Sequence, residues 1–318
     1  MTYILLIISL VLLVVGANWL VDGAAAIARR YHMSEFVIGA TIVGMGTSAP
    51  ELVVSVVSSI GGHGDIAIGN VVGSNIFNVL LILGITALLM PIKYTWENIR
   101  CDIPINIGVS VSVIALCVLN KACDGGYGLG RFSGILMLCL FAYYLWNSLR
   151  SGRDEQAAFD DAAEVTTGYY RYVSVCIISI VAGLAGLIYG GNLFVDSASA
   201  IARQWGVSEA VIGLTIVAGG TSLPELVSSV IAVTKQKGQM ALGNIVGSNI
   251  FNLLLILGTA STICPLTMGG ITFVDWGVML LSSLILLVAV YTFEKHTLDR
   301  KDALIFLLIY AGYMVWLF

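Results

Sequence analysis

The sequence contains little charge for its length. Asp, Glu, Lys and Arg together make up 11% of the 318 residues, whereas hydrophobic residues make up 58%. A water-soluble protein of this size needs a far more charged surface, so the composition excludes an ordinary soluble protein. The net charge of −4 belongs to the segments between apolar runs, and it gives no reason to expect a nucleic-acid partner.

Histidine and cysteine are also scarce, which bears on metal binding. The three histidines fall between the apolar runs, and the six cysteines show no C-x-x-C pairing. Most of the cysteines lie in or beside apolar runs, where the expected role is that of a small packing residue. We therefore expect no disulfides, no zinc or copper site and no proton relay through histidine.

Long apolar runs, in contrast, recur along the whole chain. Each reaches or approaches the roughly 20 residues that a helix needs to cross a bilayer, or does so once a neighbouring glutamate is included. The ten runs are 2–21, 36–50, 66–91, 103–120, 132–149, 172–195, 210–224, 240–273, 276–293 and 303–318. We predict an all-α integral membrane protein with ten transmembrane helices. No basic residue precedes the first run, so we do not expect a cleaved signal peptide.

The distribution of Lys and Arg predicts the orientation in the membrane. If the loops between runs are numbered one to nine, the odd loops hold twelve of the 15 Lys and Arg residues. Loops rich in Lys and Arg stay in the cytoplasm. Both termini are therefore predicted on the periplasmic or extracellular side of the plasma membrane, which is the inner membrane where a cell has two.

One unit of sequence occurs twice. The hexapeptide GTSAPE at 46–51 returns as GTSLPE at 220–225, and the match extends without a gap over 16–91 and 190–265. The offset of 174 residues contains five predicted spans. Because five is odd, the second copy must enter the membrane from the opposite side, which is an inverted-topology repeat of the kind that secondary transporters use. We predict two five-helix repeats, 1–150 and 171–318, with broken helices at the midplane.

A polar linker at 151–170 joins the two predicted repeats. It carries five acidic residues within 151–168, which makes a regulatory cation site conceivable. The stretch lacks the spacing and the turn glycine of a calcium loop, and charge runs are usually solvated. A solvated cytoplasmic linker is the preferred interpretation.

Glycine and proline interrupt each copy of the hexapeptide. Pro50 has no amide hydrogen, so the carbonyl of Gly46 is expected to lose its helical partner. Pro224 is expected to do the same to the carbonyl of Gly220. An unpaired carbonyl at bilayer depth requires something to satisfy it, and a bound cation would do so.

Two glutamates, Glu51 and Glu225, end the two hexapeptides. A carboxylate within a membrane span is costly, and it indicates a functional site. Thr47 and Ser48 precede Glu51 at helical spacing, and Thr221 and Ser222 precede Glu225 in the same way. Downstream, two further pairs of polar residues are four apart: Ser74 with Asn78, and Ser248 with Asn252.

Every side chain in this set offers oxygen, which is what hard cations prefer. Two carboxylates match one Ca²⁺ or can be shared by several Na⁺. A purely structural role for these residues remains an alternative, because Ser and Thr in membrane helices often bond to the local backbone. Asp22 and Asp196, near the ends of their spans, favour a structural or interfacial role.

The repeated motifs resemble the α-repeats of the sodium/calcium exchanger (cation/calcium exchanger) superfamily. G-T-S-[AL]-P-E followed by G-N-[VI]-V-G-S-N-I-F-N occurs twice, in opposite predicted topology. The chain looks most like the compact prokaryotic calcium/sodium antiporters, which lack a large cytoplasmic regulatory domain. The resemblance implies a ten-helix fold with four cation positions at the midplane.

The resemblance also implies roles for single residues. Glu51 and Glu225 would be the central ligands, and Thr47 and Thr221 would flank the calcium position mainly through their carbonyls. The outer Na⁺ positions would be lined by Ser48, Ser74, Ser222 and Ser248 and by the carbonyls of Gly44 and Ala218. Asn78 and Asn252 would edge the middle position. Some family members carry Asp at one of these last two positions, whereas here both are Asn.

The function that follows is secondary antiport of Ca²⁺ against Na⁺ by alternating access. The transported ions are the substrates, the bilayer is the surrounding partner, and neither a cofactor nor an obligate protein partner is expected. A Ca²⁺/H⁺ antiporter is the main alternative, because such relatives also build their site on paired glutamates. A passive cation channel would need no counter-ion. An intramembrane hydrolase is disfavoured, because no His or Lys is placed to activate a serine.

Overall fold

The computed structural model describes residues 2–124, 127–151, 170, 172–206, 218–293 and 296–317. Most of the predicted linker and the first part of the predicted span 210–224 lie outside these ranges. Helices dominate the described part of the chain, and its four strands are two residues long. The all-helical prediction is confirmed there.

Among the described residues, six helical stretches are long and apolar enough to cross a membrane. They are 2–30, 64–89, 98–120, 131–150, 173–204 and 238–263, and the successive segments 35–47 and 49–60 pass the same test together. Two shorter apolar helices cover 223–234 and 273–289. These apolar helices show that the chain is a membrane protein with several spans. The count of ten stays a prediction.

The chain divides into two compact units that do not follow the predicted repeats. Unit 1 contains Met1–Ser48 and Asn147–Asn244, and unit 2 contains Ala49–Trp146 and Ile245–Phe318. Each unit therefore takes residues from both sequence repeats. The division at 1–150, 151–170 and 171–318 is a division by repeat, and it remains a prediction.

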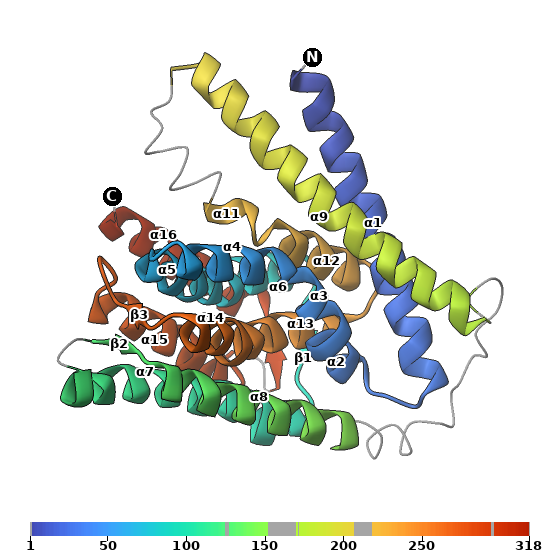
Figure 1. Cartoon of the computed structure of the whole chain (residues 1–318). Helices are drawn as coiled ribbons and strands as arrows, with labels where there is room; N and C mark the ends of the chain where they lie inside the picture. The colour runs from blue at the N-terminus through green and yellow to red at the C-terminus, as the bar shows by residue number, and fades with distance from the viewer. Residues whose placement is uncertain are drawn as a thin grey trace. The chain divides into compact units, whose positions relative to one another are not determined.

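Unit 1 is built around two long helices, α1 (Thr2–Arg30) and α9 (Val173–Gln204), which pack against each other and cross in Figure 1. Its shorter elements are α2 (Glu35–Ile38), η1 (Gly39–Val43), α3 (Gly44–Thr47), α11 (Ala218–Gly220) and α12 (Leu223–Thr234). Helix α13 (Gly238–Phe251) begins in this unit, and α8 (Arg131–Ser151) ends in it.

Glycine permits α1 and α9 to cross at backbone contact. A Cβ atom added to Gly16 would lie 2.8 Å from the carbonyl oxygen of Gly183, and one added to Gly183 would lie 2.6 Å from the backbone nitrogen of Leu20. Both distances are too short for a side chain. Small residues at such crossings let helices pack where lipid offers no hydrophobic driving force.

Two ion pairs connect the end of α12 and the residues after it to the first helices of unit 1. Lys235 Nζ lies 2.7 Å from Asp22 Oδ1, and Lys237 Nζ lies 3.1 Å from Glu35 Oε1. All four side chains are partly exposed. The contact of Asp22 agrees with the structural role that its position in the sequence favours.

Unit 2 contains two long composite helices. The first joins α5 (Gly64–Ile76), η2 (Phe77–Ile82) and α6 (Leu83–Leu89), and the second continues α13 through η8 (Asn252–Ile256) and α14 (Leu257–Ile263). The η segments are π-helical and fall at corresponding positions of the two sequence copies. Leu80, Ile82, Leu83 and Leu253 are fully buried here, so these helices form the core of the unit.

Further helices and two small ladders complete unit 2. The remaining helices are α4 (Ala49–Ile60), η3 (Asn98–Asp102), α7 (Ile103–Asp124), α15 (Phe273–Ala289) and α16 (Arg300–Leu317). Strand β1 (Ile92–Lys93) pairs antiparallel with β4 (Thr297–Leu298), and β2 (Gly128–Leu129) pairs antiparallel with β3 (Leu266–Thr267).

Candidate cation-binding site

The two hexapeptides lie at helix breaks. Helix α3 ends at Thr47, Ser48 has φ −81° and ψ 9°, and α4 begins at Ala49 with Pro50 in its first turn. In the second copy Ser222 has φ −91° and ψ 8°, and Pro224 lies in the first turn of α12. Each proline therefore occupies a position where a helix has no use for an amide hydrogen.

These breaks agree with the interruption of the helices that the glycines and prolines predict. That Pro50 leaves the carbonyl of Gly46 without its helical partner stays a prediction. Helix α3 stops before the proline, and the backbone N–H of Ser48 donates to the carbonyl of Gly44. The bond to Gly44 is 3.1 Å long. The physical reason is that a reset of the backbone at Ser48 avoids the steric clash that proline causes within a helix.

Glu225 is the best-defined acidic group of unit 1. The residue is 1% exposed, and its Oε1 accepts a hydrogen bond of 2.8 Å from the hydroxyl of Ser48. Its Oε2 is buried and has no hydrogen-bond partner among the described residues. Ser48 belongs to the first hexapeptide and Glu225 to the second, so unit 1 brings the two copies into direct contact.

Asn244 connects the two breaks in unit 1. Its Nδ2 donates to Ser229 Oγ at 2.8 Å, to Ser228 Oγ at 3.1 Å and to the carbonyl of Glu225 at 3.4 Å. Its Oδ1 lies 3.3 Å from Thr47 Oγ1. The hydroxyl of Thr47 also reaches the carbonyls of Val43 at 3.0 Å and Gly44 at 3.3 Å, so its single hydrogen has three acceptors. The side chain of Asn244 thus holds α12 against the end of α3.

Thr221 and Ser222 complete the second hexapeptide. The hydroxyl of Thr221 is buried and has no partner in the part of the chain that the structure describes, whereas Ser222 is buried and has a polar contact. A buried hydroxyl without a partner is uncommon in folded proteins. It leaves one further oxygen available close in sequence to Glu225.

In unit 2 an asparagine holds the corresponding glutamate. Glu51 is 1% exposed in the first turn of α4. Asn70 Nδ2 donates to the carbonyl of Glu51 at 3.3 Å and to Ser55 Oγ at 3.0 Å. Asn70 corresponds to Asn244 at the offset of 174 residues, so each copy uses the same residue to hold its carboxylate-bearing helix.

Four asparagines connect the two composite helices of unit 2. Asn78 Nδ2 donates to Asn249 Oδ1 at 3.0 Å, and Asn252 Nδ2 donates to Asn75 Oδ1 at 3.1 Å. The side-chain oxygens Oδ1 of Asn78 and Asn252 are buried without a partner among the described residues. Ser74 and Ser248, one residue before Asn75 and Asn249, are also buried.

The predicted ligands therefore fall into two groups. Unit 1 contains Gly44, Thr47, Ser48, Ala218, Thr221, Ser222 and Glu225, and unit 2 contains Glu51, Ser74, Asn78, Ser248 and Asn252. The sequence argument missed the positions that hold these groups, namely Asn70, Asn75, Asn244 and Asn249. All four stand within the repeated G-N-[VI]-V-G-S-N-I-F-N motif, and this repetition was the signal that could have found them.

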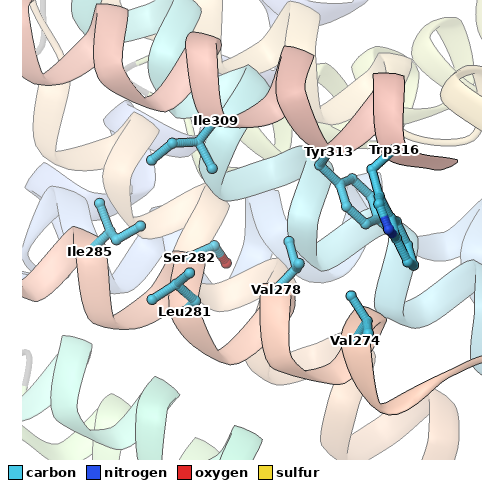
Figure 2. Close-up of a pocket in the computed structure, with 8 residues that line it drawn as sticks. All are labelled: Val274, Val278, Leu281, Ser282, Ile285, Ile309, Tyr313 and Trp316. Atoms are coloured by element: carbon cyan, nitrogen blue, oxygen red, sulfur yellow. The ribbon is translucent and has the colours of Figure 1, made fainter.

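A separate hollow of about 220 Å³ lies between α15 and α16 (Figure 2). Its lining is Val274, Val278, Leu281, Ser282, Ile285, Ile309, Tyr313 and Trp316. Apolar side chains dominate this lining, and none of the predicted ligands takes part in it. The hollow therefore does not belong to the candidate cation site.

The chain belongs to the sodium/calcium exchanger family. The family model described as "Sodium/calcium exchanger protein" matches residues 1–150 and 175–318. This is a family of membrane transporters, which confirms the resemblance inferred from the repeated motifs and agrees with cation antiport. The match leaves out most of the predicted linker.

Relatives of full length agree with this assignment. The chain is 38% identical over 323 residues to a putative antiporter CaxA of Alkalimonas amylolytica, covering 99% of this chain and 98% of that one. It is 34% identical to the inner membrane protein YrbG of Escherichia coli, covering 98% and 94%. It is 33% identical to the sodium/calcium exchanger MaX1 of Methanosarcina acetivorans, covering 99% and 98%.

A solved structure of the sodium-calcium exchanger NCX_Mj, soaked with zero Na⁺ and Ca²⁺, is similar in fold. The TM-score is 0.84 at 32% sequence identity, and the match covers 100% of this chain and 99% of that one. The similarity in fold thus agrees with the family assignment.

Proposed function

We propose that this protein exchanges Ca²⁺ for Na⁺ across the plasma membrane by alternating access. The carboxylate of Glu225 is the observation that carries the proposal. It is 1% exposed, one of its oxygens accepts from Ser48, and the other has no partner among the described residues. A buried carboxylate held in this way is costly without a cation, and a transported cation supplies the missing partner.

The proposed ligands come from both copies of the repeated sequence. Glu51 and Glu225 would be the central ligands, and Thr47 and Thr221 would flank the calcium position. The outer positions would be formed by Ser48, Ser74, Ser222, Ser248 and the carbonyls of Gly44 and Ala218, and the middle position by Asn78 and Asn252. All of these ligands are oxygens, and Ca²⁺ takes six to eight such ligands.

Competition for the two carboxylates would couple the two ions. Two negative charges balance one Ca²⁺ or are shared by several Na⁺, so full occupancy by one ion excludes the other. Such negative coupling between ligands is what an exchanger needs. The proposal includes ten spans arranged as two inverted repeats, with both termini on the periplasmic or extracellular side. Names among the relatives, such as sodium/calcium exchanger, support Na⁺ as the coupling ion.

Ca²⁺ uptake by proteoliposomes tests this function. The purified protein is reconstituted, and uptake is measured with an opposing Na⁺ gradient, with a proton gradient and with neither. We expect uptake only with the Na⁺ gradient, and we expect Glu51→Gln or Glu225→Gln to reduce it to the background of empty vesicles. Gln keeps the shape of Glu but loses the charge that binds the cation.

Glu97→Gln is the matched control, because Glu97 is a partly exposed glutamate in unit 2 outside the proposed ligands. It is expected to keep wild-type uptake. Uptake driven by protons would establish the Ca²⁺/H⁺ alternative, and uptake without any gradient would establish a channel. Normal exchange in both glutamine variants would contradict the proposed site.

A further inference from the structure

We propose that Asn75 and Asn249 are positioning residues that orient the amides of Asn252 and Asn78, so that both present oxygen to the transported cation. The inference rests on the proposed function, in which Asn78 and Asn252 are ligands. Asn75 and Asn249 themselves are not proposed to touch the ion. Their part is to hold the N–H side of each ligand amide away from it.

The hydrogen bonds form a reciprocal pair. Asn252 Nδ2 donates to Asn75 Oδ1 at 3.1 Å, and Asn78 Nδ2 donates to Asn249 Oδ1 at 3.0 Å. All four side chains belong to residues that are at most 2% exposed. Asn75 corresponds to Asn249 and Asn78 to Asn252 at the same offset of 174 residues, so each copy of the motif orients the ligand of the other copy.

A backbone carbonyl decides which way Asn75 points. Its Nδ2 donates to the carbonyl oxygen of Asn249 at 3.3 Å. A carbonyl oxygen can only accept, so the amide of Asn75 must turn its nitrogen there and its oxygen toward Asn252. Asn252 must then direct its Nδ2 toward Asn75 Oδ1, to which it donates. Because the oxygen and nitrogen of a planar amide lie on opposite sides, Asn252 Oδ1 faces away from Asn75.

The oxygens left over by this arrangement are the ones that a cation needs. Oδ1 of Asn78 and Oδ1 of Asn252 are both buried without a partner among the described residues. Buried acceptors are nearly always paired, and an amide oxygen is an ordinary ligand of Ca²⁺. If either amide were reversed, two N–H groups would face the cation and repel it.

The helices that carry the four asparagines place each positioning residue beside a proposed ligand. Asn75 and Asn78 are three residues apart and share a helical face, as do Asn249 and Asn252. Asn78 lies in the π-helical segment η2, and Asn252 begins the π-helical segment η8. Such π-helical turns are frequently found at functional sites. The local widening occurs in both copies at the residue that we propose as ligand.

A double-mutant cycle on the purified full-length protein tests the inference. Ca²⁺ affinity is measured by titration calorimetry in detergent for the wild type, Asn75→Leu, Asn252→Asp and the double variant. Loss of a residue that orients a metal ligand typically weakens binding by about 10- to 100-fold, and we expect a loss in this range for Asn75→Leu. In the Asn252→Asp background the same substitution should have little effect, because a carboxylate presents an oxygen whichever way it turns.

Asn249→Leu with Asn78→Asp repeats the cycle on the other side and keeps the inference testable if Asn75→Leu does not fold. Asn106→Leu is the matched control, because it removes a buried amide of unit 2 that donates to Ser283 Oγ at 3.1 Å. It is expected to lower the melting temperature in ion-free buffer and to leave the Ca²⁺ affinity unchanged.

The outcomes separate this inference from the proposed function. Equal losses of affinity in both backgrounds would mean that Asn75 only packs, and no loss in either would mean that it is dispensable; each result overturns the inference alone. A wild-type protein that binds no Ca²⁺, or Glu225→Gln with unchanged affinity, would overturn the proposed function and this inference with it.

Discussion

Two tyrosines of unit 2 differ in what their hydroxyls contact. Tyr313 donates to Asp275 Oδ1 at 2.8 Å, whereas the hydroxyl of Tyr94 is buried and has no partner within the described residues. Burial, followed by the negative charge of Asp302, raises the pKa of the Tyr94 hydroxyl above its ordinary value. The same chemical group therefore stabilises the fold at one position and is only desolvated at the other.

Removing each hydroxyl should have a different effect on stability. Tyr313→Phe leaves the carboxylate of Asp275 without one of its donors, and we expect it to lower the free energy of unfolding by about 1–3 kcal/mol. Tyr94→Phe removes an unpaired polar group and should leave stability unchanged or raise it. Melting temperatures of the two variants in the same ion-free detergent buffer provide the measurement. A larger loss for Tyr94→Phe than for Tyr313→Phe would contradict this assignment of partners.

At the scale of elements, the crossing of α1 and α9 depends on the size of single glycines. Gly183 lies where an added Cβ would be 2.6 Å from the backbone nitrogen of Leu20 and 2.7 Å from the carbonyl oxygen of Gly16. Three residues further along α9, a Cβ on Gly186 would be no closer than 3.3 Å to its nearest neighbour, the Cα of Gly16. Backbone atoms cannot move aside as a flexible side chain can, so the two positions tolerate a methyl group very differently.

Alanine at these two positions gives a prediction for the helix pair. Gly183→Ala is expected to force the helices apart and to destabilise the protein by about 1–3 kcal/mol, the usual cost of overpacking. Gly186→Ala adds the same methyl group at 3.3 Å from its nearest neighbour, a tight contact that needs only a shift of a few tenths of an ångström, and should cost less. Thermal unfolding of both variants, compared with wild type, measures the difference. Similar losses in the two variants would show that backbone contact does not set the spacing of α1 and α9.

The helices and the breaks at the two hexapeptides followed from the sequence, but the π-helical segments did not. Long apolar runs predicted the helical segments, because any backbone at bilayer depth must satisfy its own hydrogen bonds. The breaks at Ser48 and Ser222 were expected near the glycines and prolines. The π-helical segments η2 and η8 were not predicted, because a change from i→i+4 to i→i+5 bonding costs little locally and depends on the neighbouring helices.

At the scale of the whole molecule, the excess of Lys and Arg in the odd loops predicts both termini on the same side of the membrane. Alkaline phosphatase reports this sidedness, because its disulfides form only outside the cytoplasm. A fusion after residue 318 should be active in a bacterial host. The same reporter inserted within 151–168 should be inactive, because this stretch is predicted to be cytoplasmic. An inactive C-terminal fusion, or an active insertion, would contradict the proposed topology.

The sequence by itself determined the membrane class, the repeat, the family and the identity of the two buried glutamates. These properties follow from composition and from residue order, which can be read without knowing any tertiary contact. Only the tertiary structure decided that Ser48 donates to Glu225, that Asn244 and Asn70 hold the two hexapeptides, and that Asn75 and Asn249 turn the amides of their partners. Such contacts join residues up to 197 positions apart, and the orientation of a side-chain amide is set by whichever group faces it across the core.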